Sequence, residues 1–208
     1  MTANPNARLE AFCDGVFAIA LTLLIIDVRI PATTAIATTP DLWRALQHLL
    51  PSVFAFVLSF GIILITWVNH HEMLKLVDKS SAPFIYANGC LLLGVVFVPF
   101  PTALLGENLL TSHAAPAVVL YSATGALMAV GWALMGWTAF TPEPLARSAH
   151  AATLLRLGAR KAYFAFAFYA VCSIVAVWQP LAIAVIITAV WAYWVIYGMR
   201  GSIEADAA

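Results

Sequence analysis

Charged residues are scarce in this sequence of 208 residues, since only 10% are Asp, Glu, Lys or Arg, against roughly 25% in an average soluble domain. Ten basic and ten acidic residues cancel, so the chain lacks the basic surface that a nucleic-acid partner needs. Hydrophobic residues make up 63%, and the mean hydropathy is +0.93. A soluble domain has too little interior to bury so much apolar surface. The composition therefore predicts an integral membrane protein embedded in a lipid bilayer.

Signatures of metal, cofactor and catalytic sites are missing too. Cys13, Cys90 and Cys172 lie far apart, in or beside apolar segments, which excludes a disulfide framework and a CxxC metal site and indicates small buried hydrophobes. The sequence has no nucleophile elbow, Walker loop or dinucleotide fingerprint, and it lacks the TVGYG filter of ordinary potassium channels. We therefore expect neither an enzyme nor a bound cofactor.

Long apolar runs dominate what is present. Because about 20 apolar residues span a bilayer, the chain is long enough for six crossings, separated by segments rich in turn-forming and charged residues. The six stretches run near 11–28, 46–71, 83–105, 115–138, 160–178 and 180–199. Only "WQP" separates the last two, which predicts a tight helical hairpin with Pro180 in the first turn of its second helix. We expect one all-α, polytopic domain over residues 1–208 with six transmembrane helices.

An alternative interpretation makes the first stretch a secretory signal, with Arg8 before an apolar segment at 16–26 and a cleavage site in "TAIA". Glu10 and Asp14 disfavour this interpretation, because a signal sequence needs net positive charge there. Asp27 also follows the apolar run directly, well before any cleavage site. We therefore expect a retained transmembrane helix.

The distribution of basic residues predicts the orientation in the membrane. If the N-terminus is cytoplasmic, the inner segments hold Arg8, Lys75, Lys79, Arg147, Arg156, Arg160, Lys161 and Arg200. The outer segments then hold only Arg29 and Arg44. Since basic residues concentrate on the cytoplasmic side, we expect a multi-pass protein of the cell membrane with both termini in the cytoplasm. Four tryptophans near span ends fit the two interfaces: Trp43, Trp137, Trp178 and Trp194.

Ionisable groups in or beside apolar spans are costly, so each requires an explanation. They gather around the first two spans and are almost absent from the interiors of the last four: Arg8, Asp14, Asp27, His48, His70, His71 and Glu72. Any polar function is therefore expected in the first two spans.

The first span has an apolar stripe. At about 100° per residue, Ile19, Leu23 and Ile26 share one narrow face, Thr22 borders it, and Asp14 projects to roughly the opposite side. Spacing alone favours packing of this stripe against lipid or a neighbouring helix.

The second span ends with "WVNHHE". Trp67 and His71 lie four residues apart and share a face, whereas His70 is displaced by about 100°. Adjacent histidines cannot both point inward, and the HExxH zinc motif is absent, so the pattern argues against a metal site. An alternative is a helix end at the cytoplasmic interface, where histidine is favourable near the carbonyl pole.

Three ordered stretches resemble the transmembrane protein 175 family, which comprises the lysosomal potassium channel and its shorter bacterial relatives. Arg8 and "FCD" at 12–14, followed by "GVFAIALTLLIID", are similar to the family's opening helix, whose motif is R-x-x-x-F-S-D; Cys13 replaces the serine. "WVNHH" at 67–71 and "VPFPTALLGE" at 98–107 agree as well. Six spans with cytoplasmic termini match the bacterial form.

The resemblance implies a homotetrameric cation channel, permeable to K⁺, in which each subunit contributes its first helix to a central pore. It places the constriction at Ile19, further pore-facing apolar positions at Leu23 and Ile26, and a threonine sometimes linked to selectivity at Thr22. It also implies a packing network behind the pore helix, formed by Arg8, Phe12, Cys13, Asp14, Trp67, Asn69, His70 and His71. A cysteine hydrogen-bonds more weakly than the family's serine.

An apolar constriction of this kind gives an ion no ligands, so a cation must lose part of its hydration shell to pass. Potassium holds water less tightly than sodium, and modest potassium selectivity is expected. No arginine-rich sensor helix is present, so the conductance is expected to be leak-like and independent of voltage.

Two alternatives stay open. One is a small proton-coupled transporter that uses His70, His71 or Asp14 as a relay at the membrane edge. The other is a membrane enzyme with a cytoplasmic histidine site. The lack of a polar cluster deep in the spans argues against both.

Overall fold

The computed structural model describes residues 5–29, 36–141 and 143–206. These residues form helices and turns together with one isolated β-bridge, between Val77 and Ala146, so the predicted all-α class is confirmed. The elements are α1 (Ala7–Leu23), the 3₁₀-helix η1 (Leu24–Asp27), α2 (Thr39–His48), α3 (Leu50–Leu76), α4 (Ala82–Phe97), α5 (Pro99–Asn108), α6 (Ala114–Thr138), α7 (Ala149–Val175) and α8 (Pro180–Asp206).

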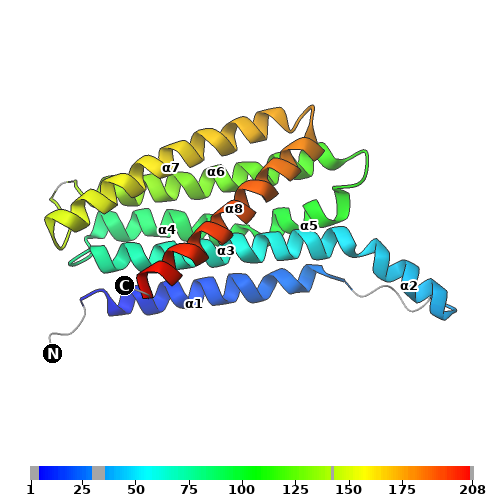
Figure 1. Cartoon of the computed structure of the whole chain (residues 1–208), viewed down its shortest axis with the longest axis horizontal. Helices are drawn as coiled ribbons and strands as arrows, with labels where there is room; N and C mark the ends of the chain where they lie inside the picture. The colour runs from blue at the N-terminus through cyan, green and yellow to red at the C-terminus, as the bar shows by residue number, and fades with distance from the viewer. Residues whose placement is uncertain (1–4, 30–35, 142, 207–208) are drawn as a thin grey trace.

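The long helices lie side by side in one bundle (Figure 1). The helix α1 forms one edge and contacts α3 and α4, while α6 lies between α4 and α7. The helix α8 crosses the bundle obliquely, and α2 extends beyond its far end. The start of α1 and the end of α8 lie at the same end of the bundle.

Four segments of the described chain are long and apolar enough to cross a membrane: Ala7–Asp27, Leu50–Leu76, Ala82–Asn108 and Ala114–Thr138. They correspond to the first four predicted spans. Beyond them, Pro180–Trp194 is a shorter apolar helix.

The second predicted span, 46–71, differs from the structure because a separate helix precedes it. Thr38 caps α2 in a reciprocal arrangement with Asp41, and Pro40 occupies the first turn, where its missing N–H costs no hydrogen bond. The polar, capped start of α2 therefore lies well before the apolar run. The long helix α3 begins only at Leu50 and continues to Leu76.

The third predicted span keeps its bounds within the apolar segment Ala82–Asn108, but its helix is broken at Val98, because Pro99 and Pro101 cannot donate backbone hydrogen bonds. One further boundary differs from the prediction for an equally local reason. The helix α7 begins at Ala149 rather than near 160, since the hydroxyl of Ser148 accepts a 3.1 Å hydrogen bond from the Ala151 N–H and caps it.

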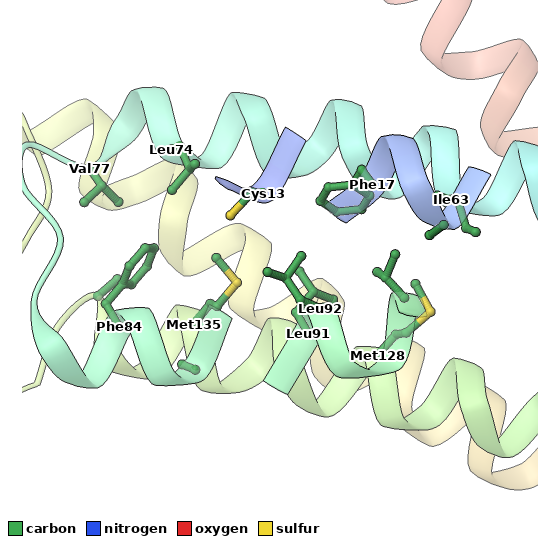
Figure 2. Packing of buried hydrophobic residues seen from close by; sticks show 14 of the residues in the cluster. Cys13, Phe17, Ile63, Leu74, Val77, Phe84, Leu91, Leu92, Met128 and Met135 are labelled. Carbon is green, nitrogen blue, oxygen red and sulfur yellow. The ribbon is translucent and has the colours of Figure 1, made fainter. Parts of the chain in front are cut away.

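The core that holds α1 is an apolar cluster shared by α1, α3, α4 and α6. Figure 2 shows Cys13 and Phe17 of α1 pointing toward Leu91 and Leu92 of α4, with methionines of α6 beside them. Cys13 and Cys172 are buried, as their sequence context indicates, and Cys90 is half-buried.

A second cluster, farther from α1, surrounds a set of buried hydroxyls. Ser59 of α3 forms hydrogen bonds of 2.7 Å with Thr102 of α5 and 2.9 Å with Tyr121 of α6. Thr102 also donates a 2.7 Å bond to the Val98 carbonyl, at the break between α4 and α5. Within a membrane, polar groups need such internal partners, so this set ties the broken third segment to its neighbours.

Candidate functional site

The helix α1 has two contrasting faces. Cys13, Phe17 and Ala20 are almost completely buried against the rest of the bundle. Ile19 is 60% exposed and Ile26 67% exposed, and Leu23 is exposed beside them. One face of α1 is therefore attached to its own chain, and the other presents the apolar stripe that helical spacing predicts.

The C-terminal end of the stripe changes helix type. The α-helix ends at Leu23, and Ile26 lies in the 3₁₀-helix η1, which the Val28 N–H closes with a 3.1 Å bond to the Ile25 carbonyl. The exposed Thr22 hydroxyl donates a 2.9 Å hydrogen bond to the Ile19 carbonyl. Because the Thr22 hydrogen is used in this bond, the lone pairs of the Thr22 oxygen form a polar group beside the stripe.

Asp14 attaches α1 to α3 on the side roughly opposite Ile19. The indole Nε1 of Trp67 donates a 2.8 Å hydrogen bond to Oδ1 of Asp14. The Trp67 ring in turn stacks on His71, with ring centroids 6.3 Å apart and planes inclined by 23°. Asp14 is thus held by a neutral donor, in contact with α3.

A buried polar chain attaches α1 a second time. The Asn88 side-chain nitrogen donates a 3.1 Å hydrogen bond to the sulfur of Cys13, and Oδ1 of Asn88 lies 2.8 Å from Nε2 of His70. Since the amide oxygen can only accept, His70 Nε2 carries the proton in this bond. The His70 ring lies 5.4 Å from the ring of Phe17 on α1 and 6.3 Å from that of Trp132 on α6.

The start of α1 is fixed by Asn6. Its side-chain nitrogen donates a 3.1 Å bond to the Val77 carbonyl, and its oxygen accepts a 2.8 Å bond from the Ser80 N–H. Asn6 is buried, although it precedes the helix. The N-terminal end of α1 is therefore tied to the connection between α3 and α4.

The structure brings together five of the predicted network residues: Cys13, Asp14, Trp67, His70 and His71. Arg8, Phe12 and Asn69 take no part in these contacts, and their packing role stays a prediction. Phe12 is 62% exposed, and Arg8 is exposed too. Arg8 lies 11 positions and Phe12 seven positions before Ile19, so both project to the same side of α1 as Ile19. Asn69 is exposed and faces a groove on another side of α3.

Asn6 and Asn88 were missed from the sequence. Asn88 is the one amide in the apolar run "APFIYANGCLLLGVVF", and a lone polar residue at that depth needs an explanation. Asn6 carries no comparable signal, because its partners lie more than 70 positions away. No three His, Cys, Asp or Glu side chains gather as metal ligands in the described parts of the chain.

Comparison with known proteins extends these observations. The family described as endosomal/lysosomal potassium channel TMEM175 matches residues 8–99, which contain α1 from its second residue together with α3 and α4. A potassium channel of Chamaesiphon minutus is 42% identical over 159 residues, which are 76% of this chain and 72% of that protein. A potassium channel of Streptomyces collinus is 42% identical over 137 residues, 64% of either chain.

A solved structure is similar over nearly the whole chain. The crystal structure of a lysosomal potassium-selective channel TMEM175 homolog from Chamaesiphon minutus superimposes with a TM-score of 0.76 at 34% identity. The superposition covers 90% of this chain and 96% of that one.

Proposed function

This chain belongs to the TMEM175 family, an ion-channel family rather than one of enzymes, and on that premise we propose that it is a potassium-permeable leak channel of the cell membrane. The two-faced character of α1 carries the proposal. A helix fastened along one face by hydrogen bonds and packing presents an unpartnered apolar stripe along the other.

In the proposed assembly, four copies of the chain surround an axis and each contributes the stripe of α1. Each chain is one domain that crosses the membrane six times, through α1, α3, the broken pair α4–α5, α6, α7 and α8. The position of both helical ends at one end of the bundle supports an even number of crossings. The excess of basic residues at that end supports its assignment to the cytoplasm.

The proposed constriction is a ring of four Ile19 side chains, extended outward by Leu23 and Ile26. No atom of these side chains can replace water in a cation's hydration shell, so the barrier is the cost of partial dehydration. K⁺ holds its water less tightly than Na⁺ and meets a lower barrier. The Thr22 hydroxyl, which donates a hydrogen bond to the Ile19 carbonyl, adds a single polar group beside the constriction.

The polar contacts behind α1 set its rotation in this mechanism. Asp14 and Cys13 are held at two positions on the side away from the stripe, by α3 and α4 respectively. A change of one residue in the register of α1 would turn Ile19 by about 100°. Two separate attachments resist that rotation better than one.

Ion flux into liposomes tests the proposal directly. Purified wild-type protein is reconstituted, and reversal potentials are measured under K⁺, Na⁺ and proton gradients. We expect K⁺ conductance above that of Na⁺, and we expect Ile19→Asn to hydrate the neck and raise Na⁺ flux relative to K⁺. Ile174→Asn on α7 is the matched control, because Ile174 is 61% exposed and lies on another helix.

Equal selectivity in wild type and Ile19→Asn would remove Ile19 from the constriction. A similar gain of Na⁺ flux in Ile174→Asn would show that the effect is nonspecific. Saturable solute flux coupled to pH, without ion conductance, would favour the transporter alternative and overturn the channel.

A further inference from the structure

A groove of about 600 Å³ lies on the bundle away from α1. Residues 62–76 of α3, 125–132 of α6, 154–169 of α7 and 190–194 of α8 supply its walls. Phe164, which is 72% exposed, stands at its rim, so the groove opens at the surface of the chain. If α7 and α8 cross the membrane as in the proposed function, on which this inference rests, a surface groove between them faces the acyl chains of the bilayer.

The groove has an apolar part and a polar part. Met128, Trp132, Phe168 and Trp191 line the apolar part, which fits hydrocarbon. Along α7, the wall from Lys161 to Tyr169 is ~12 Å long, most of the ~15 Å that makes up half of a bilayer's hydrocarbon core. This length suits the upper portion of an acyl chain lying against the protein.

The polar part carries charges of both signs. Glu72 and Asn69 line it from α3, and Lys161 lines it from α7. The Lys161 Nζ lies 5.8 Å from the ring centroid of Trp194, and no described residue accepts a hydrogen bond from it, so an anionic oxygen can do so. Glu72 also accepts a 2.7 Å bond from Lys75, an exposed pair that leaves lone pairs on the carboxylate.

We propose that this groove binds one zwitterionic phospholipid of the phosphatidylethanolamine class. The phosphate accepts hydrogen bonds from Lys161, and the primary ammonium donates to Glu72 and to the side-chain oxygen of Asn69. A choline headgroup has no N–H to donate, and a glycerol headgroup has no cation for Glu72. The charge pattern therefore favours the ethanolamine headgroup over both.

The occupied groove would also support the attachment of α1. Its wall includes Trp132, whose ring contacts His70, and His70 is bonded to Asn88. A lipid that fills the groove holds Trp132 in place and thereby stabilises this contact. The expected effect is a higher melting temperature, which can be measured without any assumption about ion conduction.

Gly158 gives a direct way to fill the groove. It lines the groove on α7, and a Cβ placed on it meets no atom within 4 Å. Gly158→Leu should therefore fold, with a side chain in the space of the lipid, and leucine is the better helix former. Gly89→Leu is the matched control, since Gly89 on α4 has equally open surroundings outside the groove.

The experiment is native mass spectrometry of the full chain with phosphatidylethanolamine, phosphatidylcholine or phosphatidylglycerol of identical acyl chains, together with thermal melts. Wild type and Gly89→Leu should retain one phosphatidylethanolamine per subunit and melt at a higher temperature with it. Gly158→Leu should lose this binding. Lys161→Gln should bind about tenfold more weakly, whereas Lys79→Gln should not change.

The headgroup assignment has its own test in Glu72→Gln, which should lose the preference for ethanolamine over choline and glycerol headgroups. Equal binding of the three lipids by wild type would overturn the assignment. Unchanged binding in both Gly158→Leu and Lys161→Gln would overturn the site. Loss of oligomers in Gly158→Leu, with no lipid bound to wild type, would show that a second copy of the chain covers the groove.

Discussion

The Trp67 indole donates its N–H to the Asp14 carboxylate over 2.8 Å, and this bond joins α3 to the side of α1 that lies away from Ile19. An acidic side chain near a membrane span is costly unless it has a partner or a function. Here the partner is a neutral donor, and Asp14 serves as an attachment point. The orientation of the apolar stripe depends on this contact and on the buried chain from Cys13 through Asn88 to His70.

Removing the Trp67–Asp14 bond should destabilise the protein measurably. We expect Asp14→Ala and Trp67→Phe each to lower the melting temperature, with a coupling energy of about 1 kcal/mol in the double-mutant cycle, as for a hydrogen bond that is partly exposed. Trp137→Phe at the end of α6 is the control for loss of an exposed indole. Additive single effects would mean that the bond contributes nothing to stability.

Substitution of Asn88 should lower the stability of the protein more than substitution of Asp14 or Trp67. Asn88→Leu leaves His70 Nε2 without its acceptor in a buried site, and we expect a loss of about 1–3 kcal/mol in the free energy of unfolding. Chemical denaturation in detergent measures this loss. Gly89→Leu, the neighbouring substitution on the exposed side of α4, should be nearly neutral; a comparable loss there would contradict the prediction.

Cys13→Ser should stabilise the protein. A hydroxyl oxygen accepts the Asn88 N–H bond better than a sulfur does, and the buried position keeps its other contacts. The expected gain is about 0.5–1 kcal/mol, measured by the same denaturation. A lower stability for Cys13→Ser would indicate that burial of the sulfur outweighs the hydrogen bond.

The contact between α3 and α8 can be tested at Gly61. The Trp191 ring lies so close to Gly61 that a Cβ there would overlap it, and the Trp191 N–H has no partner in the described chain. Gly61→Ala should therefore destabilise by about 1–3 kcal/mol. Trp191→Phe replaces the overlapping indole with a smaller ring and removes the unpaired donor, so the double variant should recover part of the loss. Strict additivity would refute the contact.

The start of α2 should depend on pH. The Thr38 hydroxyl donates a hydrogen bond to Asp41, and this contact, with the Thr38 backbone N–H, lowers the pKa of the Asp41 carboxyl below its ordinary value. A lowered pKa in the folded chain means that the stabilisation is present above the unfolded pKa and is lost as pH falls through the folded one.

Hydrogen exchange of residues 39–48, expressed relative to Thr38→Val at each pH, measures this dependence. Protection in wild type should exceed that of Thr38→Val at neutral pH, and the difference should narrow in acid, where the Thr38 hydroxyl keeps only its bond from the Asp41 N–H. A constant ratio across the pH range would show that the bond from the Thr38 hydroxyl to the Asp41 carboxylate does not stabilise the cap.

The stripe on α1 could be predicted from sequence because it depends on one helix only. The angular positions of Ile19, Leu23 and Thr22 around the helix axis, relative to Asp14, follow from helical geometry alone and do not depend on any neighbouring helix. Trp67 and the histidines were identified by their cost in a membrane and by family resemblance. Their hydrogen-bond partners were not, since Trp67 bonds to Asp14 on α1 and His70 to Asn88 on α4, which local sequence patterns do not reveal.

The boundaries that failed have a common cause. Hydropathy detects where a span is apolar, but helices begin and end according to capping groups and prolines. Thr38 and Ser148 start α2 and α7 outside the predicted apolar runs, and Pro99 divides an apolar segment that hydropathy treats as continuous. Side-chain hydroxyls and the missing N–H groups of prolines decided these positions.

The change of helix type after Leu23 affects how the stripe ends. In a 3₁₀ segment three residues complete a turn and each advances the chain by ~2.0 Å rather than ~1.5 Å. Leu23 and Ile26 are therefore stacked almost vertically, where an α-helix would stagger them. In a fourfold assembly this stacking would produce two aligned rings of methyl groups next to the Ile19 constriction. An ion would then pass through a straight apolar segment of the pore. The length of that segment would depend on whether η1 keeps its 3₁₀ winding.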